Sequence, residues 1–199
     1  PATMTAQVRA SHGLETLGAT SSSDGASRQT SSFSFRKVAF ELSRTQPILS
    51  PAEGWMLSLQ ATVAGQWSDD VLPTSEKFFL GGSRLNRGYF AGQITGDRAV
   101  SYALEVQLDT AWEIPGEAAW GLGNRLATQF YAFHDFGRTF ENAANDPNRR
   151  LSSLGFGVRA FLSESLQFDV EAVRRTTQRP DGSFSDPLDE NTLLFRSLI

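Results

Sequence analysis

The adjacent pair His134–Asp135 is the first group in this chain that could do chemistry, because a carboxylate beside an imidazole can act as a general base. The surrounding segment, YAFHDFGRTF, alternates as a β-strand does. Neighbouring side chains on a strand point to opposite faces of the sheet. The two groups therefore cannot act together on one substrate, and we expect no catalysis here.

Metal, thiol and nucleotide chemistry have little support in the sequence. The chain has no cysteine, and its two histidines, His12 and His134, are too few for an ordinary metal site. The segments GLGN and GFGV lack the third glycine and the strand–helix context of a phosphate-binding loop. We therefore predict that the protein is not an enzyme, with no catalytic residue, no metal and no cofactor.

Composition narrows the class of protein further. The 199 residues carry a formal net charge of -4 and no basic patch interleaved with aromatic residues, which argues against a nucleic-acid partner. No apolar window of about 18 residues predicts a transmembrane helix. Strands of a membrane barrel give a much weaker hydropathy signal, so a membrane protein is still allowed. The start, PATMTAQVRASHGL, has no signal peptide, so an exported protein would be represented here by a mature or excised piece.

Alternation of apolar and polar residues is the dominant pattern. In SYALEVQLDTAW (101–112), the even positions from Tyr102 to Leu108 are apolar, while the odd positions include Glu105 and Asp109. We predict about eight strands, at residues 3–12, 31–44, 54–68, 98–111, 124–137, 149–162, 164–176 and 191–199. Strands of about 9–14 residues are longer than the usual 5–6 of globular proteins and suit tilted membrane-spanning strands.

Three further features favour a membrane barrel over a soluble sandwich. Long polar linkers alternate with short turns, as in outer-membrane barrels. The four tryptophans, Trp55, Trp67, Trp112 and Trp120, lie near predicted strand ends, where an aromatic girdle would place them. The polar face carries charges of both signs that could line a lumen: Lys37, Glu41, Glu105, Asp109, Arg159, Asp169 and Glu171. We predict an all-β, antiparallel transmembrane β-barrel whose outer surface carries Leu104, Val106, Phe156, Val158, Phe168 and Val170.

The segment EKFFLGGSRLNRGYFAGQITGD (76–97) is too long and too apolar for an exposed hairpin loop. FFLGG followed by RGY, GD and the strand SYALEVQL resembles the outer-membrane transporters of two-partner secretion, the hemolysin activation/secretion family, which are relatives of barrel-assembly proteins. YAFHDFGRTF (131–140) resembles the Phe-x-Asp-x-Gly motif of that family. The resemblance runs from about residue 10 to 195 and departs from the family at Asn86, where the usual residue is hydrophobic.

The resemblance implies that this loop folds back into the barrel, where Leu85, Tyr89 and Phe90 would be buried. A buried arginine needs a partner, because an unpaired buried charge is costly. Strand parity puts Asp135 on the inward face, so we expect it to pair with Arg87. We expect these residues to hold the loop and support transport: Arg87, Gly88, Tyr89, Asp135, Phe133, Gly137 and, as a secondary contact, Glu105.

The resemblance also implies a longer protein. Family members resemble a sixteen-stranded barrel preceded by two periplasmic polypeptide-binding (POTRA) domains. Here about eight strands are expected and no such domain, so residues 1–199 resemble the C-terminal half of an outer-membrane barrel domain. An independent eight-stranded barrel is the alternative, but its interior is normally filled by side chains and has little room for a 22-residue loop.

The expected function is translocation of a partner exoprotein across the outer membrane of a Gram-negative bacterium, through a passive conduit gated by the Arg-Gly-Tyr loop. The expected partners are the secreted exoprotein and outer-membrane lipids, and the full-length protein is expected to be monomeric. Two alternatives stay open: an assembly insertase of the same superfamily, and a stand-alone small structural or adhesive barrel. The identity of the exoprotein and the number of POTRA domains are open as well.

Overall fold

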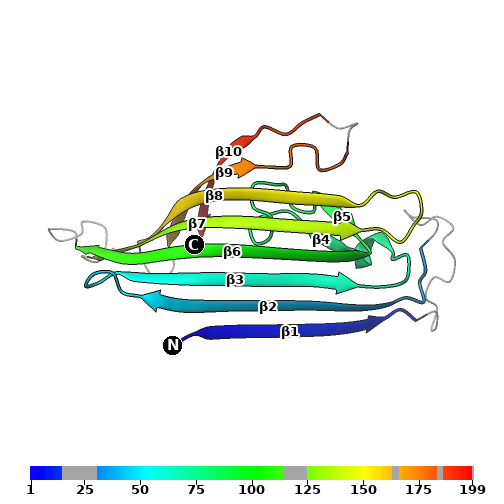
Figure 1. Cartoon of the computed structure of the whole chain (residues 1–199), viewed down its shortest axis with the longest axis horizontal. Helices are drawn as coiled ribbons and strands as arrows, with labels where there is room; N and C mark the ends of the chain where they lie inside the picture. Colours follow the sequence, from blue (N-terminus) through cyan, green and yellow to red (C-terminus); the bar gives the residue numbers. More distant parts are fainter. Residues whose placement is uncertain (15–30, 114–124, 163–165, 183–185, 199) are drawn as a thin grey trace.

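The computed structural model describes residues 1–14, 31–113, 125–162, 166–182 and 186–198. Eight long strands form one antiparallel sheet in the order β1-β2-β3-β6-β7-β8-β9-β10 (Figure 1). The strands are β1 (Thr3–His12), β2 (Arg36–Leu49), β3 (Met56–Trp67), β6 (Arg98–Glu113), β7 (Arg125–Phe140), β8 (Arg149–Phe161), β9 (Gln167–Arg175) and β10 (Asn191–Leu198). The sheet is not closed, because β1 and β10 each pair with one neighbour in the described part of the chain.

A short hairpin interrupts this order between β3 and β6. After a 3-10 turn at Thr74–Glu76, strands β4 (Phe78–Leu80) and β5 (Ile94–Gly96) pair with each other and not with the large sheet. The hairpin packs against β6, β7 and β8 (Figure 1). Its tip, residues 81–93, is called the inner loop below.

The eight predicted strands are confirmed, with one clear shift along the chain. The second strand begins at Arg36 rather than 31 and continues through Pro47 to Leu49. Pro47 lies beyond Thr45, the last residue of β2 that pairs with β1, and beside a register shift in the pairing with β3 between Pro47 and Leu49, as is usual for proline in a sheet. The short strands β4 and β5 were not predicted, because three residues are too few to show an alternating pattern.

The two faces of the sheet divide as the alternation predicted. The residues expected on the outer surface are exposed, each with at least 36% of its surface accessible: Leu104, Val106, Phe156, Val158, Phe168 and Val170. Glu105, Asp135 and Asp169, on the other face, are buried. An apolar outer face and a charged inner face are the arrangement of a membrane barrel.

Tryptophans bracket the apolar outer face. Trp67 ends β3 and is exposed, while Trp55, just before β3, packs edge-to-face with Trp112 of β6, their ring centroids 5.9 Å apart. Trp55 and Trp67 are twelve positions apart, or roughly 40 Å along a strand at about 3.3 Å per residue. At a tilt of about 45° this spans roughly 28 Å, close to the hydrocarbon thickness of a bilayer. Trp120 lies outside the described residues.

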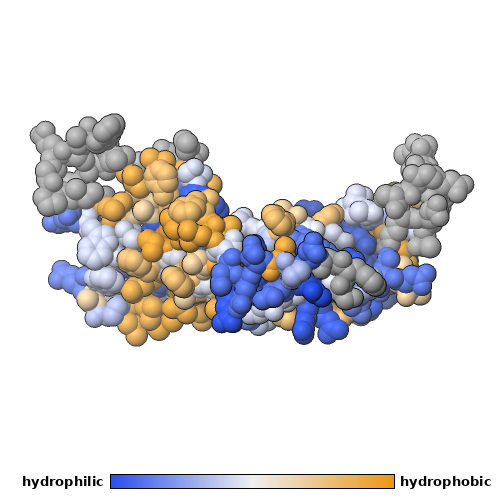
Figure 2. Space-filling view, turned by 90° about the horizontal axis from the view of Figure 1, so that it is seen from above, coloured by the Kyte–Doolittle hydropathy of each residue, from blue (hydrophilic) through white to orange (hydrophobic). Residues whose placement is uncertain are grey.

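The hydrophobic core lies between the hairpin and the inner face of the sheet. It consists of Ala64, Leu80, Leu85, Tyr89, Ile94, Ala103 and Leu151, contributed by the hairpin and strands β3, β6 and β8. Seen from above, hydrophilic residues gather over the half of the molecule in which β4 and β5 lie, and hydrophobic ones over the other half (Figure 2). In the described part of the chain, no helix is long and apolar enough to cross a membrane.

Candidate functional site

Arg87 lies at the tip of the inner loop between two residues with a positive φ angle, Asn86 and Gly88. Asn86 has a φ of 61° and is fully buried, and its side-chain oxygen accepts a hydrogen bond from the Ser101 hydroxyl at 3.3 Å. Asparagine adopts this conformation more readily than bulky hydrophobic residues do. The departure from the family pattern at this position therefore suits the backbone that it must adopt.

Gly88 follows with a φ of 87°, which also favours glycine. A β-carbon at Gly88 would lie 2.6 Å from Cγ1 of Val173 on β9, so no side chain fits between the loop and that strand. On the opposite side of the loop, a β-carbon at Gly137 would lie 2.4 Å from the side-chain oxygen of Asn86. Both glycines therefore permit the close approach of the loop to the sheet.

Arg87 forms an ion pair with Asp135 of β7. Its Nε donates to Oδ2 of Asp135 at 2.9 Å, and its Nη2 donates to Oδ1 at 2.9 Å. The backbone N–H of Arg87 also donates to Oδ2 at 2.9 Å. Two parallel side-chain bonds give the contact both strength and direction, and both residues are buried.

Two more residues complete the surroundings of the Arg87 guanidinium. Nη1 donates to Oε2 of Glu105 on β6. The guanidinium carbon lies 3.5 Å from the centroid of the Phe133 ring, in a stacked cation–π contact. Burial alone would lower the pKa of Arg87, but hydrogen bonds to Asp135 and the charges of Asp135 and Glu105 raise that pKa above its ordinary value, so Arg87 stays charged.

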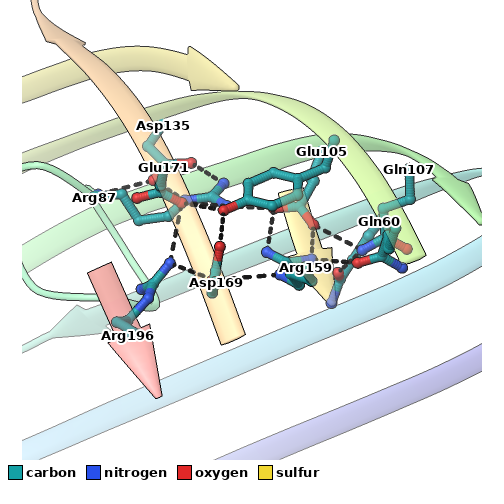
Figure 3. A network of polar contacts seen from close by, with 11 residues as sticks. Gln60, Arg87, Glu105, Gln107, Asp135, Arg159, Asp169, Glu171 and Arg196 are labelled. Carbon is teal, nitrogen blue, oxygen red and sulfur yellow. Dashed lines mark hydrogen bonds and ion pairs between the residues drawn. The ribbon is translucent and has the colours of Figure 1, made fainter. Parts of the chain in front are cut away.

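A second layer of charges lies beside this contact on the inner face (Figure 3). Arg159 of β8 donates to Oε1 of Glu105 at 2.6 Å and lies 3.8 Å from the centroid of the Tyr131 ring. The Tyr131 hydroxyl donates to Asp169 at 2.6 Å. Like Arg87, Arg159 donates to Glu105 and stacks on an aromatic ring. Glu105 therefore bridges the two arginines.

Arg196 of β10 closes the network. It donates to Asp169 at 2.8 Å and to Glu171 at 3.1 Å, and Glu171 also lies 3.9 Å from Nη1 of Arg87. Among the described residues, ion pairs join three arginines, Arg87, Arg159 and Arg196, to four carboxylates, Glu105, Asp135, Asp169 and Glu171. Withdrawal of Arg87 would leave two arginines against four carboxylates, so the wall of the sheet attracts the loop electrostatically.

Tyr89 attaches the loop at a second place. Its hydroxyl lies 2.6 Å from the carbonyl of Ser152 and 2.9 Å from the carbonyl of Thr177, and it accepts from the backbone N–H of Thr177 at 3.2 Å. Burial raises the pKa of Tyr89 above its ordinary value. The phenol therefore stays protonated and connects the loop to β8 and to the segment after β9.

Arg175 makes a further contact that the sequence did not reveal. Its Nε donates to the carbonyl of Gly88, and its Nη1 donates to the carbonyl of Asp189 at 2.8 Å. The neighbouring Arg174 is exposed on the other face and pairs with Glu190 at 2.5 Å. Alternation separates the two faces of β9, but the partner of an inward arginine depends on where the loop lies.

The structure brings all seven candidate residues of the sequence together around the inner loop. Arg87, Gly88 and Tyr89 are on the loop, while Glu105, Phe133, Asp135 and Gly137 line the wall of β6 and β7 that it contacts. Two other residues of the loop are exposed. Phe90 was expected to be buried and is 68% exposed, while the preceding residue, Tyr89, occupies the core. Arg84, on the same loop, is 71% exposed and pairs with Glu41 at 2.7 Å.

Of three comparisons with known proteins, one found a match. No curated protein and no solved structure matches the chain. A model of the haemolysin secretion/activation protein family ShlB/FhaC/HecB matches residues 1–160, a range that includes the inner loop, β6, β7 and most of β8. The chain therefore belongs to the haemolysin secretion/activation protein family ShlB/FhaC/HecB, whose members are outer-membrane transporters of two-partner secretion in Gram-negative bacteria.

Proposed function

We propose that this chain forms part of a conduit that passes a partner exoprotein across the outer membrane, and that the inner loop controls the conduit. The observation that carries the proposal is the fork of hydrogen bonds between Arg87 and Asp135, which attaches a loop tip to the inner wall of a membrane sheet. A loop that had no role inside the barrel would not need a buried ion pair, because burying charges is costly.

Arg87 and Asp135 hold the loop in the position that permits transport. Glu105 adds a second carboxylate to Arg87, and Phe133 supplies the aromatic face against which the guanidinium stacks. Tyr89 holds the extracellular side of the loop through carbonyls of the wall. Gly88 and Gly137 leave the space that the backbone of the loop occupies. Translocation is passive, and the loop sets whether the path along the inner face is open.

We also propose that residues 1–199 are the C-terminal portion of a larger barrel domain. In the described sheet, β1 and β10 each leave one edge without a partner strand. Open sheet edges do not occur in the hydrocarbon region of a bilayer, since their N–H and C=O groups would go unsatisfied. Additional strands between these two edges would close the barrel and make room for the loop.

Comparison of two arginines on the same loop tests the loop's role. In the full-length transporter, Arg87→Ala is expected to lower the amount of secreted exoprotein by at least about 100-fold, because removing one partner of a buried pair typically costs about 3–5 kcal/mol. Arg84→Ala removes an exposed arginine and serves as the matched control, with unchanged secretion expected. Immunoblots of culture medium measure secretion, and heat-modifiable migration of the transporter measures barrel assembly.

An equal loss of secretion in the two variants would contradict the assigned role, since it would show that the buried pair of Arg87 matters no more than an exposed arginine of the same loop. Loss of heat-modifiable transporter in Arg87→Ala would also contradict it, because the pair would then serve barrel folding rather than loop position.

A further inference from the structure

Three arginines lie close together on the outer surface of the sheet, at the end of the strands from which the hairpin departs. They are Arg98 of β6, Arg138 of β7 and Arg150 of β8. In the pairing register, Arg138 is directly opposite Arg150 on one side and Val100 on the other. Since Val100 is an exposed residue of the apolar outer face, the arginines continue that face toward its extracellular edge.

Arg138 and Arg150 place two like charges side by side. Directly opposed residues of antiparallel strands have β-carbons about 5 Å apart, and like charges at such positions destabilise the sheet. Neither arginine, nor Arg98, makes an ion pair or a side-chain hydrogen bond with a residue in the described ranges. The pair therefore lacks the counter-charge that would relieve the repulsion, and an external anion would supply it.

Aromatic rings orient two of these side chains. The guanidinium carbon of Arg98 lies 5.0 Å from the Trp67 ring centroid and 5.8 Å from that of Phe140. The guanidinium carbon of Arg138 lies 4.8 Å from the Phe140 centroid. Stacking occupies the face of a guanidinium and leaves its N–H edge available for a carboxylate or phosphate. Tryptophan at the end of the apolar band places these N–H groups at the level of lipid headgroups.

The apolar surface next to the three arginines favours a lipid phosphate over free phosphate as the anion. Leu154 lies four positions from Arg150 on the same face of β8, at roughly 13 Å. It lines a groove of about 500 Å³ together with Phe156, Ala172 and Leu193. A phosphate held by the arginines would therefore have an apolar path for acyl chains farther along β8, which free phosphate would not use.

We propose that Arg98, Arg138 and Arg150 bind the phosphate group of an anionic outer-leaflet lipid, whose acyl chains lie along the apolar faces of β6 to β9. Arg138 and Arg150 contact the phosphate, while Arg98 and the Trp67 and Phe140 rings form the rim of the site. The inference uses the outer face of the sheet and does not depend on how the inner loop controls transport.

Lipid binding to the full-length transporter in detergent tests this site by native mass spectrometry. The probes are lipid A with two phosphates, the same lipid with its phosphates removed, and inorganic phosphate. We expect the wild-type protein to prefer the phosphorylated lipid, and R138Q/R150Q to weaken that binding by roughly 30-fold, at about fivefold for each arginine near a lipid surface. Arg44→Gln is the control, because Arg44 of β2 is also exposed on the outer face but donates to Gln46 and lies outside the groove, and it should change binding less than about twofold.

The results of this experiment distinguish a lipid-phosphate site from a folding defect and from a site for free phosphate. Retention of lipid by R138K/R150K within about fivefold, in a heat-modifiable barrel, would support a charge-based site and would show that loss in the glutamine variant is not a folding defect. Equal binding of the two lipids by the wild type, or an equal loss in Arg44→Gln, would overturn the proposal. So would binding of millimolar inorganic phosphate that displaces the lipid, since the site would then recognise free phosphate.

Discussion

Asp135 receives three hydrogen bonds from Arg87, one from the backbone N–H and two from the guanidinium, each at 2.9 Å. The carboxylate is fully buried on β7, and the arginine belongs to a loop 48 residues earlier in the chain. One aspartate thus fixes both the side chain and the main chain at the loop tip. This contact determines where the loop lies on the inner face, and the predictions below follow from it.

Arg87→Lys is expected to lower secretion roughly tenfold, a smaller loss than that of Arg87→Ala. Lysine keeps the positive charge, and the backbone bond to Asp135 is unchanged, but an ammonium cannot form the fork or stack on Phe133 as a guanidinium does. A tenfold loss corresponds to about 1.4 kcal/mol. Secretion by the lysine variant at the wild-type level would show that charge alone holds the loop.

Tyr89→Phe is expected to loosen the loop without displacing it. The ring still packs in the core, but the carbonyls of Ser152 and Thr177 lose a buried donor, at a typical cost of about 1–3 kcal/mol. Hydrogen exchange should be roughly tenfold faster at the amide of Thr177, which donates to the Tyr89 oxygen. Exchange in β3, far from this bond, is the internal control, and uniform acceleration across both regions would contradict a local role.

Gly137→Ala should displace the loop tip from the wall. The added methyl group would lie 2.4 Å from the side-chain oxygen of Asn86 and 2.7 Å from Cδ1 of Leu80, and overpacking of this kind typically costs about 1–3 kcal/mol. Secretion should fall while the barrel still assembles. Ala132→Val is the control, because it adds bulk on the exposed, outward face of the same strand, away from the loop. Normal secretion by Gly137→Ala would show that the loop tolerates a looser contact.

Much of the fold could be predicted from the sequence, because a strand that separates lipid from a polar lumen must alternate. The same alternation placed Asp135, Phe133 and Gly137 on the inward face, and the need to pair a buried arginine then selected Asp135. Local patterns could not reveal Arg175 or the bridging position of Glu105 between Arg87 and Arg159. These contacts depend on cross-strand register and on the path of the loop, neither of which a single strand encodes.

Asn86 and Phe90 also show that a local sequence pattern does not predict the path of the loop or the direction of its side chains. Asn86 was read as a departure from the family pattern, yet its φ of 61° gives the asparagine a clear backbone role. Phe90 was expected inside and is exposed. Hydrophobicity indicates that a loop is buried somewhere, whereas the direction of each side chain follows from glycine-dependent turns that composition does not resolve.

A double-mutant cycle on Arg87 and Asp135, with secreted exoprotein per assembled transporter as the readout, tests the central claim most directly. Arg87→Ala leaves two arginines against four carboxylates among the ion pairs of the described residues, Asp135→Ala leaves three against three, and the double variant leaves two against three. The account predicts that each single variant lowers secretion and that the double variant secretes no less than Arg87→Ala, because residues in one contact do not contribute independently. Losses that add, so that the double variant shows the product of the two single reductions, would contradict the claim that this pair holds the loop.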